Sequence, residues 1–133
     1  MGIHLFYADT NEVTGNICEE NNNGIYLEES SNNHIQQNTL SYNQQGIICS
    51  YAPDNTITEN NLISNEEQAK VTTFFHKGFL IPNTWRGNYW DDWKGLCIKC
   101  IPGILYVPTK NLIGIFLPWV EIDWHPSRTP YER

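Results

Sequence analysis

The chain has 133 residues, enough for one domain with a single hydrophobic core. It carries 15 acidic and 8 basic residues and a formal net charge of -7, so it offers no basic face to nucleic acid or to an anionic membrane. The longest apolar stretch, residues 101–120, is interrupted by Pro, Gly and Lys, which argues against a membrane-spanning helix.

The first half of the chain repeats at a fixed interval. The hexapeptides NEVTGN, NHIQQN and NTITEN begin at Asn11, Asn33 and Asn55, each 22 residues after the last. Two more asparagine columns and several apolar columns keep the same step. They include Asn16, Asn38 and Asn60; Asn21, Asn43 and Asn65; Val13, Ile35 and Ile57; and Cys18, Leu40 and Leu62. A register without drift over three repeats predicts a solenoid.

Within one repeat the apolar residues are single or alternate, as at Ile25 and Leu27, which is the period of a β-strand. Asn and Gly separate these short runs, and both tolerate the positive φ of sharp corners. The pattern predicts an all-β fold, a right-handed parallel β-helix whose 22-residue coils stack about 4.8 Å apart. Equivalent asparagines should then form hydrogen-bonded ladders, with the aliphatic columns inside.

Aromatic residues crowd into NTWRGNYWDDW, residues 83–93, where the asparagine pattern breaks. Continued in steps of 22, the register places Phe79 and Pro82 where the preceding coil has Ile57 and an asparagine. Because the end of an inner stack needs large buried side chains, we expect residues 77–95 to form an aromatic cap. A sugar-binding platform is the alternative interpretation of this cluster.

The remaining residues, 96–133, form an apolar tail with regular Pro and Gly breaks, expected to lie extended over the cap or along a face of the β-helix. The chain is thus predicted to be one domain, with coils in 1–76, the cap in 77–95 and the tail after it. Its first residues occupy the middle of a coil and include no N-terminal cap. We therefore expect a longer protein to continue before residue 1.

Residues 11–75 resemble the NosD-like family of parallel β-helix repeats, through NEVTGNICEENNNGIYLEESSN and NHIQQNTLSYNQQGIICSYAPD. NTWRGNYWDDW resembles a shortened form of the W-rich stretch that closes many surface proteins of this type, and IDWHPSRTPYE (Ile122–Glu132) resembles their end. The resemblance implies an extracellular or cell-surface location, although residues 1–9 lack the features of a signal peptide. It is specific for fold rather than function, because β-helices include enzymes, maturation factors and surface stalks.

The leading interpretation is a non-catalytic surface or exported domain that is structural or binds carbohydrate weakly. One alternative is a carbohydrate-active enzyme of β-helix type: a polysaccharide lyase, epimerase or hydrolase. The other alternative, a NosD-like accessory factor for copper-enzyme maturation, rests on the family name. Copper handling needs clustered His, Met or Cys, whereas this chain has 1 Met and 4 scattered His.

Tyr7, Glu29 and Tyr51 occupy equivalent positions in successive coils, just after a predicted strand. Tyrosine and glutamate along one face can hold a glycan by stacking and hydrogen bonding, so these three residues are the predicted binding site for a polysaccharide or other glycan. No Lys or Arg occurs between Met1 and Gln68, so an anionic uronate would meet no positive charge there.

No catalytic residue is assigned, and calcium is the candidate cofactor because carboxylates are its ligands. Asp91, Asp92 and Asp123 would form its site if the tail folded back over the cap. Cys97 and Cys100 form a single CxxC motif, which leaves three interpretations open: two zinc ligands, a local disulfide or two unpaired thiols.

Overall fold

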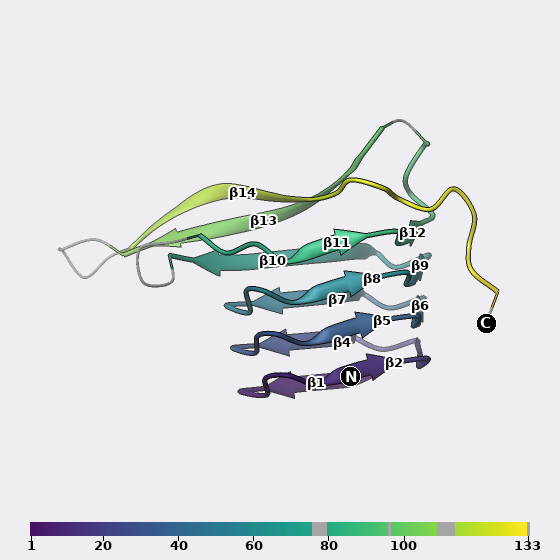
Figure 1. Cartoon of the computed structure of the whole chain (residues 1–133), viewed down its shortest axis with the longest axis horizontal. Coiled ribbons are helices and arrows are strands. Elements are labelled where there is room, and N and C mark those ends of the chain that lie inside the picture. Colours follow the sequence, from purple (N-terminus) through teal and green to yellow (C-terminus); the bar gives the residue numbers. More distant parts are fainter. Residues whose placement is uncertain (76–79, 96, 109–113, 133) are drawn as a thin grey trace.

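The computed structural model describes residues 1–75, 80–95, 97–108 and 114–132. Every regular element in this part of the chain is a β-strand, and none of it is a helix that could cross a membrane. The strands follow the chain as four stacked coils with a hairpin above them (Figure 1).

Each coil contributes three strands, and corresponding strands lie above one another. The first coil contains β1 (Ile3–Phe6), β2 (Glu12–Thr14) and β3 (Ile17–Glu19). The second contains β4 (Asn23–Glu28), β5 (His34–Gln36) and β6 (Thr39–Ser41). The third contains β7 (Gln45–Ser50), β8 (Thr56–Thr58) and β9 (Asn61–Ile63). The fourth contains β10 (Glu67–Phe74), β11 (Thr84–Arg86) and β12 (Tyr89–Trp90).

Strands of successive coils pair in parallel, in the register that the sequence predicts. Ile25 pairs with Ile3 on one side and with Ile47 on the other, each 22 residues away. Ten strands form one sheet, in the order β1-β4-β7-β10-β13-β14-β11-β8-β5-β2, and four form the other, β12-β9-β6-β3. The parallel β-helix is confirmed.

The predicted aliphatic columns fill the interior of the coils. Their most deeply buried members are Ile25, Leu27, Ile35, Leu40, Ile47, Ile57 and Leu62. Glycine is required at Gly46, near the start of β7, because a Cβ there would collide with the carbonyl oxygen of Gln68 in the next coil. Close stacking of coils thus depends on glycine at this corner as well as on apolar burial.

Three rows of asparagine side chains join the coils, as predicted. In the row of Asn16, Asn38 and Asn60, the backbone N–H and the Nδ2 of Asn16 donate to Oδ1 of Asn38 at 2.9 and 3.1 Å. The Nδ2 of Asn38 in turn donates to the carbonyl of Val13 at 2.9 Å and to Oδ1 of Asn60 at 3.0 Å. The amide oxygen of Asn38 therefore accepts from the coil before it, and its NH₂ group donates both to that coil and to the coil after it.

Asn38→Ala tests these ladders, since it removes the side-chain partner of a buried carbonyl and of a backbone N–H in the preceding coil. We expect a loss of about 1–3 kcal/mol of unfolding free energy, measured by urea titration. Asn22→Ala is the matched control because Asn22 is exposed, and it should stay within about 0.5 kcal/mol of the wild type. Equal unfolding midpoints for the two variants would contradict the role assigned to Asn38.

Trp85 and Trp90 of the aromatic segment are buried in the core of the fourth coil, but the register predicted for this segment was wrong. Trp85, not Phe79, takes the place beside Ile57, and Asn88, not Pro82, accepts hydrogen bonds from Asn60. Phe79 itself lies outside the described residues. The step between these coils is 28 residues instead of 22, because additional residues lie between β10 and β11. With that shift, NTWRGNYW aligns with NTITENNL of the coil before.

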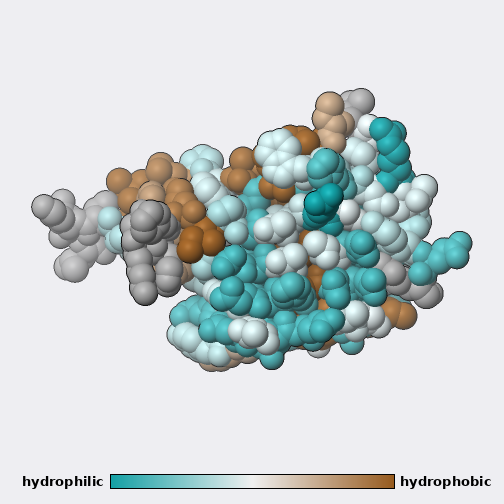
Figure 2. All heavy atoms as spheres, in the orientation of Figure 1, coloured by the Kyte–Doolittle hydropathy of each residue, from teal (hydrophilic) through white to brown (hydrophobic). Residues whose placement is uncertain are grey.

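The tail forms an antiparallel hairpin of β13 (Lys99–Val107) and β14 (Ile115–Asp123). β13 adds a parallel strand beside β10, whereas β14 crosses to the opposite half of the sheet and pairs with β11 at Asp123 (Figure 1). Hydrophobic side chains gather on the projecting part of the hairpin, while hydrophilic ones cover the lower coils (Figure 2). The described apolar residues exposed on β14 are Ile115, Phe116, Leu117 and Val120.

Candidate functional site

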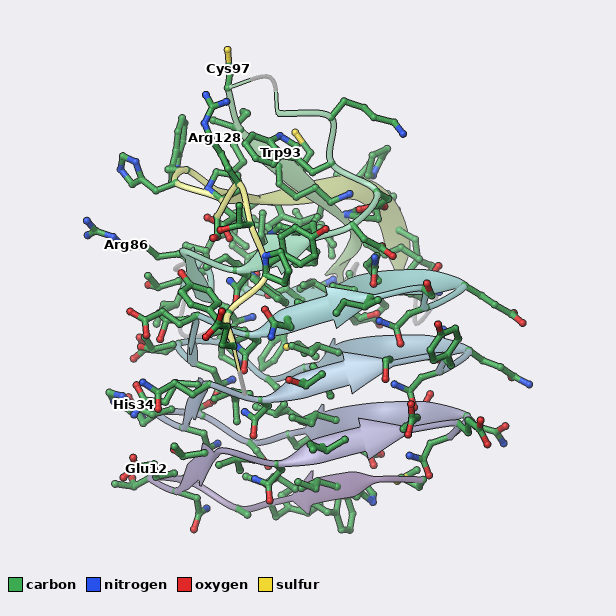
Figure 3. All side chains as sticks on the ribbon, turned by 90° about the vertical axis from the view of Figure 1, so that its right-hand side faces the viewer. Glu12, His34, Arg86, Trp93, Cys97 and Arg128 are labelled. Carbon is green, nitrogen blue, oxygen red and sulfur yellow. The ribbon has the colours of Figure 1, made fainter. Side chains whose placement is uncertain are left out.

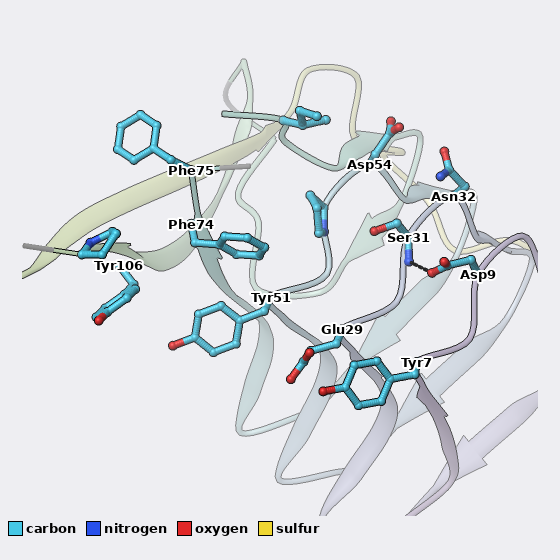
Figure 4. Close-up of a pocket in the computed structure, with 13 residues that line it drawn as sticks. Tyr7, Asp9, Glu29, Ser31, Asn32, Tyr51, Asp54, Phe74, Phe75 and Tyr106 are labelled. Carbon is cyan, nitrogen blue, oxygen red and sulfur yellow. Dashed lines mark hydrogen bonds between the residues drawn. The ribbon is translucent and has the colours of Figure 1, made fainter. Parts of the chain in front are cut away.

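A groove of about 590 Å³ lies beside the C-terminal ends of β1, β4 and β7 in the ten-stranded sheet. There, β10 and β13 extend beyond the turns that follow the strands of the lower coils. β10 and β13 have 8 and 9 residues, whereas β1 and β4 have 4 and 6. The extra residues project beyond the stacked turns and form a step. We call this cavity the step groove; its floor comes from the turns and its wall from the two longer strands (Figure 4).

Tyr7, Glu29 and Tyr51 lie on the floor of the step groove, one from each of three successive coils (Figure 4). All three have left-handed backbones, with φ of 48°, 48° and 49°. The backbone N–H groups of Tyr7 and Glu29 donate to carbonyls one coil above at 3.1 and 2.9 Å, which offsets the strain of that conformation. The fold therefore brings together the three residues that the sequence predicts for glycan binding.

The floor carries polar groups in fixed positions. The hydrogen bond to the Glu29 carboxylate raises the pKa of the Tyr7 hydroxyl, so Tyr7 remains neutral and keeps a proton to donate. The carboxylate of Asp9 accepts a hydrogen bond from the backbone N–H of Ser31 at 2.7 Å. Asp54 adds a third carboxylate from the third coil. The floor thus presents phenol and carboxylate groups side by side.

The wall of the step groove is aromatic. Phe74 at the end of β10 lies with its ring centroid 5.6 Å from that of Tyr51, and Phe75 follows it. Tyr106 of β13 is held against Phe116 of β14, with ring centroids 5.2 Å apart. The repeat did not predict these wall residues, although the aromatic pair at 74–75 after a strand was a usable signal.

Asp123, a predicted calcium ligand, is fully buried and ends an asparagine row. Its two carboxylate oxygens accept five hydrogen bonds of 3.0 to 3.2 Å. The donors are the backbone N–H groups of Gly87, Asn88 and His125, Nδ2 of Asn88 and Nε1 of Trp90. The carboxylate thus takes the position that the next asparagine of the row would occupy.

Glu121, which the sequence reasoning did not identify, ends a second row in the same way. Its carboxylate accepts hydrogen bonds of 2.8 to 3.2 Å from the next asparagine down and from two tryptophans. The donors are the backbone N–H and Nδ2 of Asn83, Nε1 of Trp85 and Nε1 of Trp119. Alternate residues of β14 therefore finish two rows of the coil stack.

Asp91 and Asp92 lie elsewhere and have other partners. Asp91 accepts a hydrogen bond from the backbone N–H of Ser64 at 2.6 Å and another from the side chain of Gln68. Asp92 forms an ion pair with Lys99 at 2.9 Å. Among the described residues no group of three or more His, Cys, Asp or Glu side chains could hold a metal ion. Calcium at these aspartates remains a prediction that this geometry does not support.

The stacked coils, parallel pairing and asparagine rows define the chain as a parallel β-helix repeat protein. In a comparison with protein-family models, residues 1–95 match NosD, described as a periplasmic copper-binding protein. The chain belongs to the NosD family. The periplasmic description of the family agrees with the exported location that the sequence resemblance implies. Searches of curated proteins and of solved structures each found no significant match.

The described donor groups do not fit a copper site. Cys18 and Cys49 are buried in the core, and burial raises the pKa of both thiols, which keeps them protonated. His4 stacks on a tyrosine and binds a glutamate of the next coil. Cys97 and Cys100 are exposed free thiols, and Cys97 points away from the stack in Figure 3. Copper prefers clustered soft or imidazole ligands, and the described residues include no group of three or more His, Cys, Asp or Glu side chains that could hold a metal ion.

Proposed function

We propose that this chain is a non-catalytic, exported β-helix module that binds a glycan in the step groove. The observation that carries the proposal is the convergence of Tyr7, Glu29 and Tyr51 on the floor of one cavity with an aromatic wall. A concave site with apolar walls and a few convergent polar groups is the usual form of a ligand site.

The chemistry of the groove suits a sugar better than a purely apolar ligand. Aromatic rings such as Tyr51 and Phe74 can cover the C–H face of a pyranose, while carboxylates accept hydrogen bonds from its hydroxyl groups. Floor residues repeat once per coil, about 4.8 Å apart, which is close to the length of one sugar unit. A repeating polymer therefore matches a repeating floor.

Binding without cleavage is the simpler interpretation of the carboxylates. A glycosidase needs two carboxyl groups on opposite sides of the scissile bond. Here Glu29 is engaged by the hydroxyl of Tyr7, and Asp9 is engaged by a backbone N–H. These contacts hold both groups on the floor, on one side of any ligand. A lyase, epimerase or hydrolase remains the alternative, and chain cleavage would identify it.

Tyr51→Ala should weaken binding about tenfold, because it removes a ring that lines the groove. The measurement is retention on a polysaccharide panel by affinity electrophoresis, with and without calcium, together with an assay of chain cleavage. Tyr42→Ala is the matched control: Tyr42 is likewise a tyrosine at a coil turn, with φ of 55°, but it is exposed and does not line the groove. Equal retention of the two variants would contradict the proposal.

A role in copper-enzyme maturation rests on the family description alone. Titration of the protein with copper tests it directly. Stoichiometric binding would require the copper role to be reconsidered, and Cys97→Ser with Cys100→Ser would then show whether the CxxC motif is responsible. No binding above background would remove that role for this chain.

A further inference from the structure

The described residues that line the step groove carry charge of one sign only. Asp9, Glu29 and Asp54, one from each of three coils, line it, and none of its described lining residues is Lys, Arg or His. A cavity walled by protein and lined by one sign of charge concentrates ligands of the opposite sign. The charge pattern therefore selects among glycans, beyond what the aromatic wall alone would do.

Three basic side chains of the described residues, His4, Arg86 and Lys99, lie outside the groove. His4 is bonded to Glu28 at 2.9 Å, and Lys99 is paired with Asp92 at the other side of the last coil. Arg86 of β11 points outward from the stack (Figure 3). None of these three lines the groove, so none of them neutralises its carboxylates.

Aromatic rings lie next to these carboxylates. The side chain of Tyr7 lies beside that of Glu29, and Tyr51 lies between Glu29 and Phe74 in the groove (Figure 4). An ammonium group placed there would meet ring faces and carboxylates together, and both attract a cation. A uronate carboxylate would instead be repelled by the floor.

We propose that the glycan bound in the step groove is a polymer of amino sugars with free, protonated amino groups; this inference rests on the proposed glycan-binding function. The floor offers acceptors at several levels of the stack, so successive amino sugars of one chain can be bound by successive coils. A polymer of this kind uses the repeat, whereas a single amine would use only one level.

The test compares glucosamine oligosaccharides, their fully N-acetylated counterparts of equal length and oligogalacturonates, by calorimetry at low ionic strength. We expect the glucosamine oligomer to bind at least about tenfold more tightly than the acetylated one, and galacturonate to bind most weakly. Binding of the glucosamine oligomer should also weaken with added salt, because the groove is open to solvent.

Glu29→Gln should lower the affinity for the glucosamine oligomer by a larger factor than the affinity for the acetylated oligomer, because only the former carries a charge that the carboxylate attracts. Glu20→Gln is the matched control, because Glu20 is an exposed glutamate at another coil turn, with φ of 57°, outside the groove. Both variants remove one charge from an acidic protein. Equal losses in the two variants would show general attraction of a polycation and would overturn the inference.

The remaining outcomes separate the two proposals. Preference for the acetylated or galacturonate oligomer, still dependent on Tyr51, would overturn the amino-sugar inference and leave glycan binding intact. No binding of any oligosaccharide would overturn the proposed function itself. If oligolysine bound with the same dependence on Glu29 while the sugars did not, the groove would be an amine site for peptides, and both proposals would fail.

Discussion

Trp90→Ala is expected to lower the free energy of unfolding by about 3–5 kcal/mol, one of the two largest effects of a single substitution in this chain. The side chain of Trp90 is 1% exposed and fills the core at the closed end of the stack. Its ring centroid lies 5.8 Å from that of Trp85, and its Nε1 donates to Asp123 at 3.1 Å. Alanine would leave a cavity there and remove one donor from a buried carboxylate.

Urea unfolding followed by circular dichroism measures this loss, with Trp124→Ala as the control. Trp124 is 62% exposed, so its removal should change stability by no more than about 0.5 kcal/mol. Trp90→Phe should fall between the two, because it keeps part of the packing but loses the N–H and the volume of the second ring. If Trp90→Ala left stability intact and abolished polysaccharide retention instead, Trp90 would belong to a sugar platform.

Asp123→Asn is the second large prediction, although it changes only one atom of the side chain. The carboxylate accepts five hydrogen bonds, whereas an asparagine in its place would turn an NH₂ group toward N–H donors on one side. Each hydrogen bond to the charged group contributes about 1.5–3 kcal/mol, so losing those of one oxygen should destabilise the protein by at least that amount.

Thermal and urea unfolding of Asp123→Asn should therefore show a clearly lower midpoint than Asp92→Asn. Asp92 is exposed and paired only with Lys99 at the surface, where such a pair contributes about 0–1 kcal/mol. Equal unfolding midpoints for the two variants would mean that the five hydrogen bonds to the buried Asp123 carboxylate do not stabilise the protein as expected. A destabilised variant with unchanged glycan binding would further separate this end of the stack from the groove.

The sequence predicts the coils well because their contacts obey one rule. Asn16, Asn38 and Asn60 make the same hydrogen bonds at each step, so a constant spacing of 22 residues is required and is visible. The rule fails only where residues are added between β10 and β11, which changes the step to 28. Asn83 then still has its place in the row, but a fixed spacing cannot find it.

The carboxylates that end the asparagine rows could not be predicted, because their contacts occur once in the chain and follow no repeat. Glu121 meets Asn83 across 38 residues of sequence, through a hairpin that follows no repeat. The pattern gave no reason to prefer an acidic residue of β14 over the aspartates beside Trp90, which were predicted as metal ligands instead. Only pairing of β14 with β13 and β11 determines which of its side chains faces the core.

Part of the floor of the step groove could be predicted, because it follows the repeat. Tyr7, Glu29 and Tyr51 share a column, so the repeat alone places them in line. The wall depends on how far β10 and β13 extend beyond the turns, and on the position of β13 beside β10. Neither property is periodic, and Tyr106 in particular lies in a strand that the sequence indicated only as an extended apolar segment.

The acidic row ends also determine whether the stack can grow. An asparagine amide both accepts and donates hydrogen bonds, so a row of them can pass from one coil to the next without limit. The side chains of Glu121 and Asp123 accept the hydrogen bonds that Asn83 and Asn88 donate toward the end of the stack, and have no N–H to offer in return. A further coil, whether from this chain or from another molecule, could not continue these two rows. The two carboxylates thus end these hydrogen-bonded rows, which disfavours end-to-end stacking of a second molecule on this end of the repeat.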